Sequence, residues 1–124
     1  MDLDIDHLRG WIGNSEIISE RLTPQLVERF NATLDIEEDV GAGAKAPQMI
    51  HFCLAQPVAP ASRLGHDGHP KRGGFLPPVS LPSRMWAGGE ITIHRPLVID
   101  EMVTRTSRID DVEVKQGRSG MLCF

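Results

Sequence analysis

The sequence predicts an α+β domain in which helices come first and an antiparallel sheet follows. Residues 23–35 open with Thr-Pro and place apolar side chains at helical spacing. Residues 90–124 instead alternate apolar and polar side chains and are rich in β-branched residues, which is typical of strands. At 124 residues the chain has the length of a single domain, and we expect one domain spanning 1–124.

The composition excludes several classes of function. A net charge of −4 with scattered basic residues argues against a nucleic-acid surface, which needs clustered Lys and Arg. The sequence contains no run of 18 apolar residues, so it predicts no membrane span. The acidic N-terminus is unlike a signal peptide, and we expect a cytoplasmic protein. Cys53 and Cys123 lie in apolar runs and are expected to be buried free thiols.

The N-terminal elements follow from local signals. Residues 4–12 can form a short helix that Asp4 or Asp6 caps and Gly13 ends, and residues 15–18 can form a strand. Thr23 suits an N-cap and Pro24 the first helical position of a helix reaching residue 35. Residues 35–46 are acidic and then small, which predicts a flexible connection.

The apolar run 47–57 lies between two prolines, and its periodicity fits a buried helix or a strand. Its first proline and its Met, Leu, Ala and Gln content favour a helix. A loop then covers 59–89, where eleven of 31 residues are Gly or Pro. So long a loop is disordered or functional, and apolar residues such as Phe75, Met85 and Trp86 favour order.

The last third predicts three strands, near 90–99, 102–115 and 118–124. The apolar phase changes near Asp110-Asp111, which predicts a bulge, and Gln116-Gly117 predicts a turn. The chain stops within an apolar strand. Because an open apolar edge favours aggregation, we expect a C-terminally truncated domain, or one whose sheet another chain completes.

Short motifs assign no chemistry. The phosphate and dinucleotide loops are absent. His66 and His69 suggest a metal site, but they lack a third ligand at a telling spacing, and a turn on Asp67-Gly68 is favoured. His51 and His94 stand alone in apolar or alternating segments, and no Ser-His-Asp or Cys-His set can be assembled around them.

A longer pattern resembles the N-terminal half of the MaoC-like acyl-CoA dehydratases, in their mesaconyl-CoA and itaconyl-CoA hydratase-like branch. The resemblance touches nearly the whole chain. It rests on Leu8-Arg9, Trp11 to Gly13, Ala32 to Asp35, Leu64, Gly65, Asp67 to Pro70, Arg72 to Pro78, Leu81-Pro82, Arg84 to Gly89, Arg95 to Leu97, Arg105, Ser107 and Gly117 to Gly120. One departure is Asp100-Glu101, where the family has Gly-Asp; Asp tolerates a left-handed turn, so the turn should survive.

The resemblance implies a hot-dog fold, in which an antiparallel sheet wraps around a central helix, here residues 47–56. It also implies pairing of two hot dogs, fused or as a homo- or hetero-dimer, with an acyl-CoA thioester in a tunnel between them. The implied activity is reversible hydration of a short-chain enoyl-CoA, C4–C5 dicarboxylic in this branch, without a cofactor other than the CoA thioester itself. The family's catalytic Asp-His pair sits in the other hot dog, so no residue here is assigned as catalytic.

Within this family the Gly/Pro loop would contact the substrate. Lys71, Arg72 and Arg84 are expected at the CoA phosphates because of their charge. The remaining predicted contacts are Gly74, Phe75, Met85, Trp86, Ala87 and Gly88, with the apolar ones walling the acyl group. For each residue the competing interpretation is packing of the loop over the domain.

Two further functions remain open from the sequence. The chain can be an inactive subunit or acyl-CoA-binding module that pairs with a separate catalytic subunit. A thioesterase of the same fold is the weaker alternative, because it needs a carboxylate near the central helix and residues 47–57 contain none.

Overall fold

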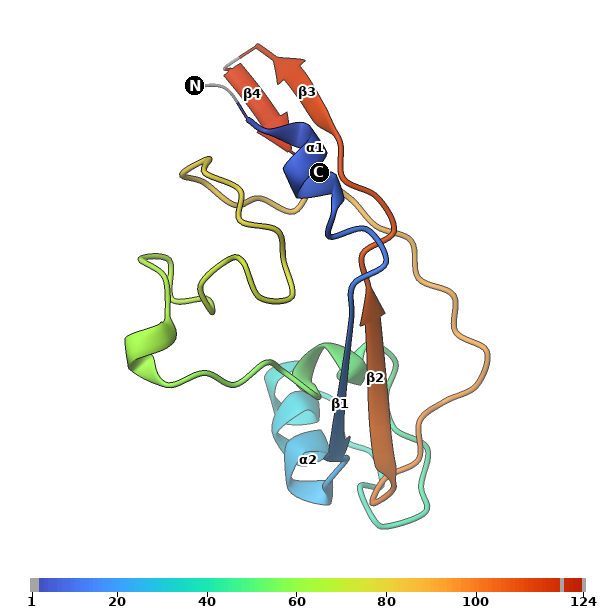
Figure 1. Cartoon of the computed structure of the whole chain (residues 1–124). Helices are drawn as coiled ribbons and strands as arrows, with labels where there is room; N and C mark the ends of the chain where they lie inside the picture. Colours follow the sequence, from blue (N-terminus) through green and yellow to red (C-terminus); the bar gives the residue numbers. More distant parts are fainter. Residues whose placement is uncertain (1–2, 119, 124) are drawn as a thin grey trace. The chain divides into compact units, whose positions relative to one another are not determined.

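The computed structural model describes residues 3–118 and 120–123, which form two compact units (Figure 1). Unit 1 comprises the residues up to 16, residues 57–88 and those from 106 onward; unit 2 comprises residues 17–56 and 89–105. The helices are α1 (Ile5–Arg9) and α2 (Pro24–Thr33), with short 3₁₀ helices η1 (Ile50–Cys53) and η2 (Ala61–Arg63). The strands are β1 (Ser15–Arg21), β2 (Met102–Arg108), β3 (Val114–Gly117) and β4 (Gly120–Cys123).

The described strands form two antiparallel pairs, β1–β2 and β3–β4. In unit 2 the Ser19 and Thr104 hydroxyls are 2.8 Å apart across β1 and β2, and the backbone N–H of Leu22 donates to the Glu101 carbonyl at 2.9 Å. The β3–β4 register runs from Val114 opposite Cys123 to Gly117 opposite Gly120.

Unit 2 contains a hydrophobic core beneath α2. The Thr23 side chain caps α2 by accepting from the Leu26 N–H at 3.3 Å, and Pro24 takes the first turn. Val27 then faces the core, where the buried residues are Leu22, Val27, Ala46, Ile50, Leu54, Ala55 and Ile99.

Unit 1 relies more on hydrogen bonds. Asp4 caps α1 by accepting from the His7 N–H at 3.1 Å, and Leu8 is buried. Arg9 donates to the carbonyl of buried Val112 at 2.7 Å. Gly13, at φ +88°, donates its N–H to the Ile109 carbonyl at 2.7 Å, so glycine suits the end of this segment.

Several predictions from the sequence are confirmed. The helices capped by Asp4 and Thr23 are present, as are strands beginning at residues 15, 102 and 120. The loop 59–89 contains only η2 as a helix. Asp100 takes φ +73°, the left-handed turn expected of it.

Five predictions are wrong. Residues 47–57 hold only the four-residue η1, because left-handed Met49 (φ +73°) precedes it and residues 54–55 are extended or left-handed. Residues 90–99 form no strand beyond a bridge between Lys45 and Val98; Pro96 lacks the N–H that a ladder needs. Residues 102–115 are two strands separated by an irregular stretch, 109–113, instead of one bulged strand.

The fourth and fifth errors concern the last turn and the burial of the thiols. The final turn follows Gly117 instead of centring on Gln116-Gly117. Both cysteines are free, but Cys53 is exposed and Cys123 only partly buried. Burial raises the pKa of the Cys123 thiol, which the charge of Arg72 opposes.

Candidate functional site

The loop identified from the sequence begins with a turn at residues 64–70 of unit 1. Asp67 Oδ1 accepts from the His69 backbone N–H at 3.0 Å, and the Gly65 N–H donates to the His69 carbonyl at 2.7 Å. Gly68 takes φ +79°, which favours glycine. The predicted turn on Asp67-Gly68 is therefore confirmed. Among the described residues, no three His, Cys, Asp or Glu side chains converge as around a metal ion.

Arg84 joins this turn through an ion pair. Its Nε lies 3.5 Å from Asp67 Oδ2, with the two side chains 30% and 28% exposed. The pKa of Asp67 lies below its ordinary value of 3.8, mainly because of the His69 N–H and further because of the Arg84 charge. The Asp67 carboxylate thus positions Arg84, and an anionic ligand has to compete with this carboxylate for the guanidinium group.

The other two predicted phosphate contacts also have partners within the loop. Arg72 Nη1 donates to the carbonyls of Val79 at 2.8 Å and Leu81 at 2.6 Å. Lys71 Nζ donates to the Ser62 carbonyl at 3.3 Å and is exposed. These contacts favour a loop-packing role for Arg72, whereas the ammonium of Lys71 keeps two further donors.

Two side chains that follow α1 hold the Gly74-Phe75 segment. Trp11 Nε1 donates to the Gly74 carbonyl at 3.0 Å, and Asn14 Nδ2 donates to the Phe75 carbonyl at 2.9 Å. Phe75 is itself partly buried. The sequence did not indicate that Trp11 and Asn14 bind carbonyls of the loop, because no local signal marks a contact between residues some sixty positions apart.

The end of the loop is apolar and exposed. Met85 is 86% exposed and Trp86 76% exposed, and the adjacent Ala87 and Gly88 are exposed as well. None of the nine predicted contact residues lines either of the two hollows described below. The structure thus brings Arg72, Gly74 and Phe75 into the packed part of the loop and leaves residues 85–88 open to contact.

Sequence reasoning missed a groove in unit 2, which we term the apolar groove. It has a volume of about 390 Å³ and is lined by residues 46–51 and 91–97. Its apolar side chains include Met49, Ile91 and Ile93, which are 39%, 48% and 43% exposed. An apolar lining with few polar groups is typical of small-molecule sites.

Main-chain contacts explain why the two walls of the groove meet. The Ala46 N–H donates to the Leu97 carbonyl at 2.8 Å, and the Ile99 N–H donates to the Ala44 carbonyl at 2.9 Å. The groove's polar side chains include His51, His94 and Arg95. The two histidines could be identified from the sequence, but their place in one groove could not, because it depends on a pairing between segments some fifty residues apart.

A match to a family model shows to which protein family the chain belongs. The model of the hydroxyacyl-thioester dehydratase type 2 family matches residues 48–124. The chain belongs to the hydroxyacyl-thioester dehydratase type 2 family. This family match includes the whole Gly/Pro loop and most of the apolar groove; only Ala46 and Pro47 of the groove precede it.

A curated relative extends the type 2 dehydratase relationship to the N-terminal residues. The chain is 38% identical over 118 residues to a mesaconyl-C(4)-CoA hydratase of Chloroflexus aurantiacus (strain ATCC 29366 / DSM 635 / J-10-fl). The alignment covers 93% of this chain and 41% of the relative, so the chain spans less than half of that protein's length. The resemblance to the hydratase-like dehydratase branch is confirmed. No helix in the described residues is long and apolar enough to cross a membrane.

Proposed function

We propose that the chain is the non-catalytic half of an enoyl-CoA hydratase or 3-hydroxyacyl-CoA dehydratase and helps to shape the acyl-CoA tunnel. The observation that carries this proposal is the 38% identity to a mesaconyl-C(4)-CoA hydratase across 93% of the chain. In hydration, a base takes one proton of water, the resulting oxygen bonds to the β-carbon, and an acid delivers a proton to the α-carbon. We assign neither proton transfer to this chain and expect both from a partner hot dog.

The apolar groove supports an acyl-binding role. Its exposed Ile91, Ile93 and Met49 can pack against the acyl or pantetheine part, which is apolar along much of its length. Arg95 lies at the same groove and suits the free carboxylate of a C4–C5 dicarboxylic acyl group. The substrate class we propose is therefore a short-chain dicarboxylic acyl-CoA.

The Gly/Pro loop supports a separate role at the CoA phosphates. Lys71 is exposed and Arg84 is held by a partly exposed ion pair, so both can turn to a phosphate. Arg72 supports the loop through its two carbonyl contacts and acts on the ligand indirectly.

An acyl-CoA-binding subunit that pairs with a separately encoded catalytic hot dog is the second candidate. The exposure of Met85 and Trp86 favours it, since adjacent exposed apolar side chains commonly mark a contact surface. Under either candidate we place the protein in the cytoplasm, as half of a homo- or hetero-dimeric hot-dog pair, with the thioester as its ligand.

Calorimetric titration with mesaconyl-C4-CoA tests the proposed binding. Ile91→Ser should weaken binding about tenfold, because the acyl chain loses apolar contact. Ile17→Ser is the matched control: Ile17 is 67% exposed on β1, outside the groove, and its loss should leave affinity unchanged. Binding that is equally affected by both substitutions would contradict the groove assignment.

Free CoA as a second titrant tests the loop separately. Arg84→Gln should weaken CoA and mesaconyl-C4-CoA alike, whereas Arg29→Gln, a charge change on α2, should weaken neither. Loss of acyl-CoA affinity without loss of CoA affinity would sink the phosphate role of Arg84.

An assay of hydration activity distinguishes the two candidate functions, neither of which is catalytic in this chain alone, from a complete enzyme. The decrease of enoyl-thioester absorbance should be absent with this chain alone and should appear when a catalytic hot dog is fused or added. Activity of the isolated chain would refute a non-catalytic half.

A further inference from the structure

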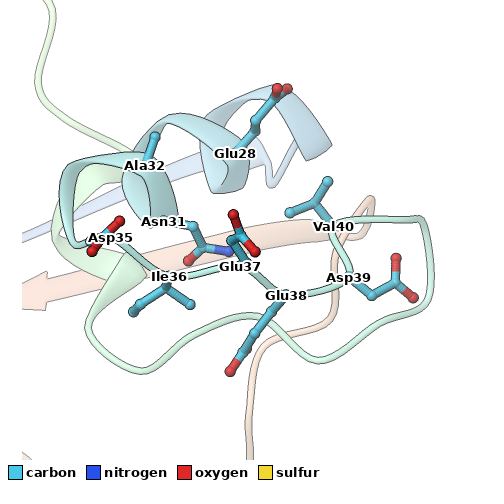
Figure 2. A pocket seen from close by; sticks show the side chains of 9 residues that line it. All are labelled: Glu28, Asn31, Ala32, Asp35, Ile36, Glu37, Glu38, Asp39 and Val40. Atoms are coloured by element: carbon cyan, nitrogen blue, oxygen red, sulfur yellow. The ribbon is translucent and has the colours of Figure 1, made fainter.

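A second hollow in unit 2 lies along the C-terminal half of α2 (Figure 2). Its volume is about 710 Å³, and its walls are the α2 residues Glu28, Asn31 and Ala32 together with residues 35–40. Asp35, at φ +57°, reverses the chain after the helix, and the Ile36 N–H donates to the Asn31 carbonyl at 2.9 Å. The following segment is thereby held beside α2 and closes the second wall of the hollow.

The hollow has a strongly negative lining. Five of its nine lining residues are acidic and none is basic: Glu28, Asp35, Glu37, Glu38 and Asp39. In the part of the chain that the structure describes, none of these carboxylates is in an ion pair. The C-terminal end of α2 adds the negative pole of its helix dipole, and its last turn carries no basic residue.

A buried amide provides an independent indication of a ligand. Asn31 is only 4% exposed, and its Oδ1 has no hydrogen-bond partner among the residues that the structure describes. Figure 2 shows the Asn31 carboxamide extending from α2 into the hollow, with its nitrogen toward Glu37 and its oxygen on the opposite side, whereas Glu38 points away from the helix. Buried polar atoms are nearly always satisfied, so an unpaired acceptor in the wall of an acidic hollow indicates a missing N–H donor.

We propose that this hollow binds an organic cation, whose ammonium or guanidinium N–H groups bond Glu37 and Asn31. Such a group matches the lining in charge and supplies donors, and the carboxylates around the hollow suit a ligand with more than one positive charge. A free polyamine and a basic side chain of another chain share this chemistry. The CoA phosphates have the wrong charge for this hollow, so the site is distinct from the proposed thioester site and does not depend on it.

Calorimetric titration of the full chain with spermidine, at physiological ionic strength, tests the proposal. Glu37→Gln keeps the side-chain size, removes one charge and should weaken spermidine binding about tenfold. Glu20→Gln is the matched control, because Glu20 is exposed on β1 and does not line the hollow; it should bind like the parent. Equal weakening by both substitutions would show diffuse attraction only and overturn the proposal.

Nuclear magnetic resonance gives a test that needs no substitution. The side-chain amide signals of Asn31 should shift with spermidine at the concentrations that titrate calorimetrically. Argininamide, titrated in the same way, distinguishes the sources: tighter binding of spermidine indicates a free polyamine, and tighter binding of argininamide indicates a guanidinium side chain. Unchanged Asn31 signals with both probes, or displacement of spermidine by equimolar Mg²⁺, would overturn the proposal.

Discussion

Asp67 couples the ionisation of one carboxylate to the geometry of the loop at 64–70. Its pKa is lowered from 3.8, first by the His69 N–H and then by the Arg84 charge, so folding favours the charged form. The stabilisation is therefore fully present at pH values above the ordinary pKa of the carboxyl group. It is lost as the pH falls through the lower pKa that Asp67 has in the folded protein. We expect the turn to stay intact at pH 5 and to loosen only below pH 3.8.

The His69 amide shift, followed against pH, measures this transition. Its midpoint should lie below 3.8 in the parent. Asp67→Asn cannot ionise yet retains an acceptor oxygen, so its His69 amide should show no such step. A parent midpoint at or above 3.8 would be inconsistent with the geometry described for the turn.

Asp100 shows where the chain uses a residue that its backbone conformation disfavours. It takes φ +73° in the turn that precedes β2, while its carboxylate lies 3.8 Å from Arg21 in an exposed pair of little energetic value. Asp100→Gly and Asp100→Ala both lose the carboxylate, and only glycine fits the left-handed region freely. We expect the Gly variant to exceed the Ala variant by about 1 kcal/mol in unfolding free energy. Urea denaturation measures the difference, and equal stabilities would contradict a strained position.

At the scale of elements, α2 depends on its N-cap. The Thr23 hydroxyl satisfies the Leu26 N–H, which has no partner within the helix. Thr23→Ala should lower the free energy of unfolding by about 1 kcal/mol, whereas Thr23→Ser should cost only a few tenths. Circular dichroism in urea gives both values, and a Ser variant as unstable as the Ala variant would show that the hydroxyl is not the stabilising group.

Elements with local signals could be predicted from the sequence, and elements set by distant contacts could not. Asp4, Thr23 and Pro24 mark helix ends within one turn of the residues that they cap. The run 47–57 has no such marker, and its shape follows from burying Ile50, Leu54 and Ala55 against α2 and Ile99. Alternation at 91–94 predicted a strand that the structure does not contain, because a strand needs a partner that local sequence does not specify.

The candidate site likewise has features that the sequence predicts and features that depend on distant contacts. Charge and composition identified the loop residues Lys71, Arg72 and Arg84. They could not distinguish an arginine that packs within the loop from one that can bind a ligand. That distinction came from the two carbonyls at Arg72. The apolar groove and the acidic hollow each combine segments whose meeting follows from the packing of unit 2.

At the scale of the whole molecule, the two units differ in what stabilises each of them. The hydrophobic core belongs to unit 2, while unit 1 buries few large apolar residues, Leu8 and Val112 among them, and relies on side-chain bonds to loop carbonyls. Hydrogen bonds contribute less net free energy than apolar burial of this extent. Unit 1 should therefore open locally more often than unit 2.

Native-state hydrogen exchange resolves the two units. The amides of Ala46 and Ile99, bonded beside the unit 2 core, should exchange only through the largest opening, and that of Gly13 in unit 1 through a smaller one. Ile99→Val removes one buried methylene and should lower the opening free energy of the Ala46 amide by about 1 kcal/mol while leaving Gly13 unchanged. One common opening free energy for all three amides, shifted equally by Ile99→Val, would mean that the chain unfolds as a single cooperative body.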